Sequence, residues 1–188
     1  MLQRASKKLI LVFIFALIAL VTTYSYISLN TIGLSEDDIA RDIEKRGTSS
    51  VEIILMTDSR DEQFILFSND TSGQLGMIYY EPQPLIPTRY KFLGGSNIEG
   101  KADTYHEYGV HNFGQTAEKG WERLIVVYGR NEPNANRLEL DLGDRTVIRN
   151  IDGKNYFLEV VRFEQEKWGN PNIRFFDSDG KDITEKFY

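Results

Sequence analysis

The chain begins with an uninterrupted run of apolar residues. Thirteen apolar residues run from Leu9 to Val21, and Thr22 to Leu29 extend the run without a charge. A helix of about 21 residues rises roughly 30 Å, which matches the hydrocarbon core of a bilayer. The pattern therefore predicts a single transmembrane helix over residues 9–29.

The charges on either side of this run predict its orientation. Basic residues precede it and acidic residues follow it: Arg4, Lys7 and Lys8, then Glu36, Asp37 and Asp38. The positive-inside rule places residues 1–8 in the cytoplasm and the rest of the chain outside. A cleaved signal peptide is the alternative, but Val21–Tyr24 lacks the small residues of a cleavage site. We expect an uncleaved signal-anchor in the cell membrane.

Residues 30–47 form the predicted juxtamembrane segment, and the stretch from Leu34 to Gly47 has the pattern of a short helix. Ser35 is placed to cap it, acids fill its first turn, and bases fill its last, as the helix dipole favours. Ile39 and Ile43 supply only a narrow apolar stripe. We expect this helix to be a spacer between the membrane and the domain.

From Thr48 onward the pattern changes to short runs rich in aromatic and branched residues, separated by turn-forming clusters. The predicted strands are 50–56, 63–67, 75–80, 89–93, 123–128, 137–142, 146–151, 155–163 and 172–176. Tyr156 to Val161 is apolar on both faces, which is typical of a central strand. Residues 96–120 lack periodicity and are predicted to be a long connection.

These runs predict a mainly β fold, either an antiparallel β-sandwich or two small packed β-units. The predicted extracytoplasmic domain is 48–188, with halves at 48–95 and 120–188. Residues 177–182 carry three aspartates and begin like a calcium loop, but Lys181 and Asp182 occupy positions that need an oxygen ligand and a glycine. Asp179-Gly180 instead predicts a tight hairpin in which both residues have positive φ, and Asp152-Gly153 repeats it.

Composition limits the classes of function and partner that the chain can have. The chain has no cysteine, which excludes disulfides and thiol catalysis. Its net charge is −6, although the segment before the apolar run is basic. The exterior part is therefore strongly acidic, and we expect no nucleic-acid partner.

Two groups of residues are candidates for a site. His106, Glu107 and His111 are a candidate loop metal site, although the histidine spacing does not match the helical zinc motif. Trp168, in a turn-like stretch, and Trp121, at a strand entrance, are candidate ligand contacts that could stack on sugar rings.

Gly95 to Ala102 fits most of a phosphate-binding loop. Ala102 replaces the hydroxyl that binds magnesium, and no helical pattern follows. We expect neither a nucleotide nor another cofactor.

The strand-and-turn order over residues 50–184 is similar to that of a known group of proteins. "VEIILMTDSRDEQFILFSNDTSGQLGMIYYEP" resembles the N-terminal unit, and "LIVVYGRNEPNANRLELDLGDRTVIRNIDGKNYFLEVVRFEQEKWGNPNIRFFDSDGKDIT" the C-terminal unit, of small membrane-anchored or secreted extracytoplasmic proteins of Gram-positive spore-forming bacteria. The resemblance implies an exterior location and a β-architecture. It implies no catalytic or binding residue.

We therefore expect a non-enzymatic, membrane-anchored protein of the cell envelope. Its β-rich domain would present a binding surface to another envelope protein or to a cell-wall polymer. The alternative is an envelope hydrolase with an acid pair or a loop metal site near His106–His111.

Overall fold

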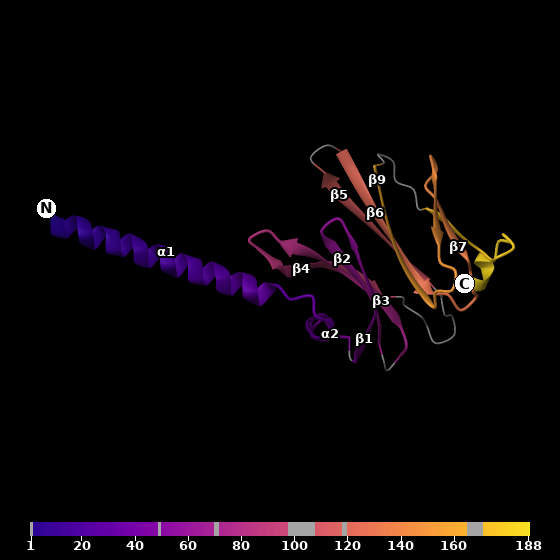
Figure 1. Ribbon diagram of the computed structural model, residues 1–188, viewed down its shortest axis with the longest axis horizontal. Coiled ribbons are helices and arrows are strands. Elements are labelled where there is room, and N and C mark those ends of the chain that lie inside the picture. The colour runs from indigo at the N-terminus through magenta and orange to yellow at the C-terminus, as the bar shows by residue number, and fades with distance from the viewer. Residues whose placement is uncertain (1, 49, 70–71, 98–107, 118–119, 165–170) are drawn as a thin grey trace.

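The computed structural model describes residues 2–48, 50–69, 72–97, 108–117, 120–164 and 171–188 (Figure 1). The chain is mainly β, with antiparallel sheets and one N-terminal apolar helix, as the sequence predicted. The elements are α1 (Leu2–Asn30), α2 (Glu36–Lys45), β1 (Val51–Ser59), β2 (Glu62–Asn69), β3 (Leu75–Gln83), β4 (Ile86–Asn97), β5 (Tyr108–Ala117), β6 (Gly120–Arg130), β7 (Arg137–Asp141), β8 (Thr146–Asn150), β9 (Tyr156–Glu164), β10 (Asn172–Phe176) and the 3-10 helix η1 (Thr184–Phe187).

The described strands form three antiparallel sheets. Sheet A has the order β1-β2-β3-β4, sheet B the order β5-β6-β9, and sheet C the order β10-β7-β8. Figure 1 shows them one after another along the long axis, with sheet B between the other two. All nine predicted strands are present, with bounds close to those expected.

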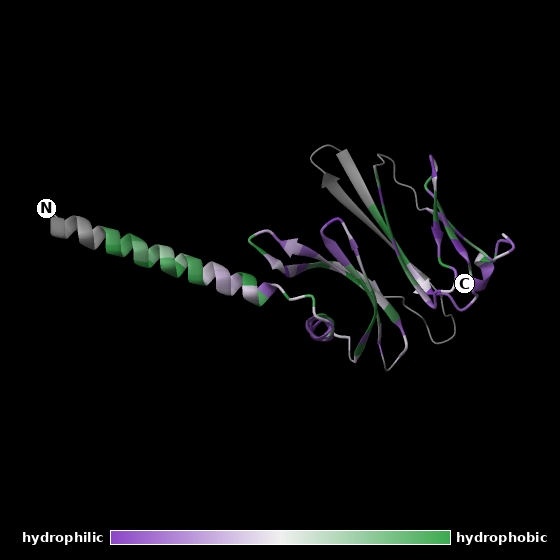
Figure 2. Cartoon of the chain, viewed as in Figure 1, coloured by the Kyte–Doolittle hydropathy of each residue, from purple (hydrophilic) through white to green (hydrophobic). Residues whose placement is uncertain are grey.

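Sheet B is apolar on both faces because alternate side chains of its strands enter different cores. Leu124, Val126 and Tyr128 of β6 pack toward sheet A, and Ile125 and Val127 pack toward sheet C. β9 has the same division, so Tyr156 to Val161 is apolar on both faces as predicted. The prediction that it is a central strand was wrong: among the described strands β6 is central in sheet B and β9 lies at its edge, buried on both faces because sheets A and C pack on either side of it. Figure 2 shows green, hydrophobic positions along the facing strands.

α2 covers the other face of sheet A. Ser35 caps it, accepting a hydrogen bond from the Asp38 amide at 3.2 Å, as predicted. Ile39 and Ile43 are fully buried against Ile65, Phe67, Ile78 and Tyr80. The expectation that this helix is a spacer was wrong, because it packs on the domain. Its apolar stripe is narrow, but both isoleucines of the stripe are buried against a large apolar face of sheet A.

β5 corrects the prediction that 96–120 is one long connection. Residues 108–117 pair with β6 along their full length. Gly109 lies opposite Tyr128, and a Cβ atom at Gly109 would lie 2.5 Å from Cζ of the Tyr128 ring. Glycine weakens the strand pattern in the sequence, but here it makes room for the ring.

The two Asp-Gly corners also differ from the predicted turn. Gly180 and Gly153 have φ of 78° and 68°, whereas Asp179 and Asp152 do not have positive φ. At the first corner the Asp177 carboxylate accepts hydrogen bonds from the amides of Asp179 and Lys181 at 3.0 and 2.9 Å. At the second corner the Asn150 side-chain oxygen accepts a hydrogen bond from the Asp152 amide at 2.9 Å. Both are therefore turns held by an aspartate or asparagine side chain, with glycine at the left-handed position.

α1 is an exposed apolar helix that leaves the domain at one end (Figures 1 and 2). Leu9–Asn30 is long and apolar enough to cross a membrane, a property that a signal sequence near the N-terminus shares. The chain then joins sheet A directly, since Ile32 and Tyr90 of β4 exchange two backbone hydrogen bonds of 2.9 and 2.8 Å.

Candidate functional site

A groove opens between β1 of sheet A and β9 of sheet B. Its volume is about 480 Å³, and its lining is mainly apolar. β1 contributes Ile54 to Thr57, and β9 with the turn before it contributes Lys154 to Leu158. Binding pockets in proteins commonly have a few hundred cubic ångströms and an apolar lining with a few polar groups.

A β-bulge gives β1 its apolar wall. The pairing of β1 with β2 shifts between Ile53 and Leu55, which leaves Ile54 as the extra residue. Ile53 packs toward α2, whereas the next two side chains, Ile54 and Leu55, both pack on the core between sheets A and B. The bulge therefore places two successive apolar side chains on the groove side, where regular alternation would place one.

The opposite wall belongs to the same core. Tyr156 and Leu158 of β9 pack with the residues between sheets A and B, and Tyr156 remains half-buried. Met56 on β1 is 38% exposed. The groove is thus an open margin of the inter-sheet core, where apolar side chains meet solvent.

Both walls are strand edges. Among the described strands, β1 pairs only with β2 and β9 only with β6. An edge strand presents backbone N–H and C=O groups that can pair with an added strand. The site therefore combines apolar contact area with backbone hydrogen-bonding capacity.

Beyond the groove lining, Arg162 of β9 connects that strand to the β1–β2 turn. Its guanidinium donates to Ser59 Oγ at 3.0 Å and to the Ser59 carbonyl at 3.2 Å, and it forms an ion pair with the Glu62 carboxylate. Both charged side chains are largely buried, at 11% and 14% exposure. Because Ser59 and Glu62 flank the β1–β2 turn, the contact fixes the separation of the two sheets there.

The charges near this contact affect a buried phenol. Tyr79 stacks on Phe64 in the core, with ring centroids 5.5 Å apart and an interplanar angle of 5°. Burial, and then the negative charges of Glu62 and Glu81, raise the pKa of Tyr79 to about 12. The phenol is therefore neutral at physiological pH and acts as a packing residue.

The groove lining is poor in charged side chains. Across the part of the chain that the structure describes, no group of three or more histidine, aspartate or glutamate side chains is placed to hold a metal ion. Lys154 is the charged residue in the groove lining, and its ammonium is 3.1 Å from the Glu159 carboxylate. Lys154 in the lining and Arg162 beyond it are thus each paired with a carboxylate.

The residues singled out in the sequence are mostly not placed. His106, Glu107 and Trp168 lie outside the described residues, as do the side chains of His111 and Trp121. The backbone puts His111 opposite Val126 and Trp121 opposite Thr116. The two residues are therefore about five residues, or roughly 17 Å, apart along the paired strands, and the sites predicted from them stay predictions.

The groove itself was not found from sequence. The one local signal is the run "EIILM", Glu52 to Met56, in which four apolar residues follow one another where a strand with one wet face would alternate. That run fits a buried strand equally well. Comparisons of the chain with protein-family models, curated proteins and solved structures gave no match.

Proposed function

We propose that this chain is a single-pass, membrane-anchored protein of the cell envelope with its domain outside. It uses the groove between β1 and β9 to bind an extended apolar segment of another envelope protein. The domain acts as a β-sandwich of sheets A and B, open along one margin, and the bound segment adds a strand to β1 or β9. This mode is strand addition, in which backbone hydrogen bonds give affinity and side-chain pockets give specificity.

One observation carries the proposal: the apolar groove between sheets A and B is lined on both sides by edge strands, β1 and β9. Either feature alone is common on protein surfaces. Together they match an extended peptide, which offers backbone donors and acceptors on its edges and apolar side chains on one face. A cell-wall polymer fits this groove less well, because sugar rings need exposed aromatic faces and many polar partners.

The anchor supports the proposal in a second way. Confinement to the outer face of a membrane raises the local concentration of a partner in the same envelope, so that modest affinity suffices. The apolar length of Leu9–Asn30 and the basic residues before it are the basis for this part. The envelope hydrolase remains the sequence-based alternative, and no contact among the described residues favours it.

Two experiments test the proposal. A reporter that is active only outside the cytoplasm, fused after Tyr188, should be active. Capture of the full chain after chemical crosslinking in its native membrane should recover the same partner for the wild type and for Ile148→Glu, which alters an exposed side chain on β8 away from the groove. Leu55→Glu should lose the partner, because a carboxylate would enter the apolar groove. Equal recovery with both variants would contradict the assignment of the groove.

A further inference from the structure

A second cavity lies where α1 meets the domain. It has a volume of about 430 Å³ and lies between the end of α1, one face of α2 and the strands β3 and β4. The last residues of α1 form part of its wall. If α1 crosses the bilayer, the cavity therefore opens at the level of the outer headgroups.

The cavity wall is rich in positive charge. Four cationic side chains line it against two carboxylates: Arg41, Lys45, Arg46 and Arg89 against Asp38 and Asp42. Asp42 is engaged, because it pairs with Arg46 at 2.9 Å and accepts a hydrogen bond from the Tyr80 phenol at 2.9 Å. Within the described residues, neither Arg41 nor Lys45 has an ion-pair partner. An excess of two positive charges faces the cavity in a domain that is acidic as a whole.

Arg89 ties this charge to the end of the membrane helix. Its guanidinium donates to the Ser28 carbonyl at 2.9 Å, to the Thr31 carbonyl and to Thr31 Oγ1 at 3.1 Å. These bonds satisfy carbonyl groups at the C-terminus of α1, where a positive charge is favourable. Ile32 pairs with Tyr90 next to it, so the cavity keeps a defined position relative to α1.

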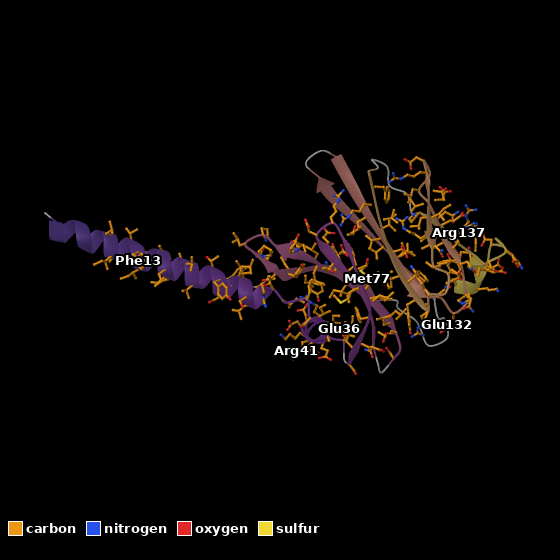
Figure 3. The ribbon with its side chains drawn as sticks, viewed as in Figure 1. Phe13, Glu36, Arg41, Met77, Glu132 and Arg137 are labelled. Atoms are coloured by element: carbon orange, nitrogen blue, oxygen red, sulfur yellow. The ribbon has the colours of Figure 1, made fainter. Side chains whose placement is uncertain are left out.

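The β3–β4 hairpin gives a second, independent indication. Its tip carries Leu85, which is 72% exposed, followed by Ile86 and Pro87. Figure 1 shows this hairpin extending toward α1, so that along the long axis its tip reaches the last turns of that helix. Figure 3 shows Arg41 on α2 at the same end of the domain. An exposed apolar hairpin tip and a basic cavity at the same end of the domain are the features expected of a surface that touches lipid.

We propose that this cavity binds the headgroup of an anionic phospholipid of the outer leaflet. The inference rests on the membrane anchor of the proposed function but not on the groove. Arg41 and Lys45 contact the lipid phosphate, and Leu85 contacts the acyl-chain boundary. The anionic lipid offsets the excess positive charge, and the bound lipid fixes the height and tilt of the domain above the membrane.

The test is native mass spectrometry of the full chain in detergent. The chain is titrated with dioleoyl phosphatidylglycerol, with dioleoyl phosphatidylcholine and with inorganic phosphate. We expect one saturable phosphatidylglycerol adduct, weaker binding of phosphatidylcholine, whose cationic choline opposes the wall, and no adduct at matched concentrations of inorganic phosphate. An inorganic phosphate adduct as strong as the lipid adduct would indicate a free-anion site and overturn the proposal.

A pair of matched double variants locates the site. Arg41→Gln with Lys45→Gln should weaken phosphatidylglycerol binding roughly 30-fold, since each basic residue near a membrane surface adds about fivefold. Lys181→Gln with Lys186→Gln removes the same charge from the C-terminal end of the chain and should bind as the wild type does. Equal affinity of the cavity variant and the wild type, or equal weakening of both variants, would overturn the proposal. All four lysine and arginine side chains are exposed, so circular dichroism should show an unchanged β fold.

Carbonate extraction of native membranes separates this inference from the anchor. A chain that carbonate releases contradicts the anchor and the lipid site together. A chain that resists carbonate while its cavity variant binds lipid like the wild type contradicts the lipid site alone.

Discussion

Arg162 of β9 and Glu62 of β2 form an ion pair, and it joins sheet B to sheet A. The same guanidinium holds Ser59 at the end of β1. The pair is largely buried, and loss of one member would leave the other charge without its partner in a region of low dielectric. It therefore fixes the position of β9 relative to the β1–β2 turn, next to the groove.

Replacement of Arg162 by methionine should lower the free energy of unfolding by about 2 to 4 kcal/mol, the cost of breaking a buried pair. Lys91→Met is the matched control. It breaks an ion pair with Glu81 whose side chains are 56% and 40% exposed, and it should cost less than about 1 kcal/mol. Urea denaturation of the full chain in detergent, followed by circular dichroism, measures both. A smaller loss for R162M than for K91M would contradict the role given to Arg162.

Truncation of Ile39 to alanine should cost about 2 to 5 kcal/mol, because the side chain is fully buried between α2 and sheet A. Glu44→Ala on the exposed side of the same helix should change stability by less than about 0.5 kcal/mol. The same denaturation experiment applies. If α2 were a detached spacer, the two variants would behave alike.

A methyl group at position 109 should destabilise the domain by about 1 to 3 kcal/mol through overpacking against the Tyr128 ring. Thermal unfolding of Gly109→Ala measures this effect. Combining it with Tyr128→Leu, which removes the ring, should cost less than the sum of the two single changes. Strict additivity would mean that β5 does not pair with β6 in this register.

The domain should lose stability as the pH rises from 10 to 12. Tyr79 has its pKa raised to about 12 by burial and by Glu62, whereas an unfolded tyrosine ionises near 10. The unfolded state therefore loses its proton first, so the contribution is complete below pH 10 and disappears as the pH approaches 12. Burial also raises the pKa of Tyr80 and Tyr128, which adds to the effect. For Tyr79→Phe, the free energy of unfolding, measured by urea denaturation at pH 9, 10 and 11, should fall less steeply with pH than for the wild type. An equally steep fall would mean that Tyr79 is not the source of the pH dependence.

The sequence predicted local structure well where side-chain patterns alone decide it. The alternation in β7, the capping of α2 by Ser35 and the nine strand positions all come from interactions within a few residues. β5 was missed because its strand character depends on pairing with β6, and Gly109 makes the pattern look irregular. The packing of Ile39 and Ile43 on sheet A could not be predicted either, because their partners on β2 and β3 are distant in the sequence.

The groove was beyond sequence-based prediction for the same reason. It arises where two strands far apart in the sequence, β1 and β9, lie side by side without pairing, which is a property of how sheets A and B are placed. Neither β1 nor β9 carries a motif for it. The bulge at Ile54 leaves only a longer apolar run, which is also what a fully buried strand shows.

Site-specific photocrosslinking in the native membrane tests the central claim most directly. A photoreactive residue at position 56 lies at the groove, and the same residue at position 148 lies on the exposed edge strand β8 of sheet C. We predict an adduct at position 56 and none at position 148. Peptide mapping should assign the adduct to an extended apolar segment of another protein, and Leu55→Glu should abolish it. The same adduct at both positions, or one at position 56 that persists with Leu55→Glu, would contradict the account.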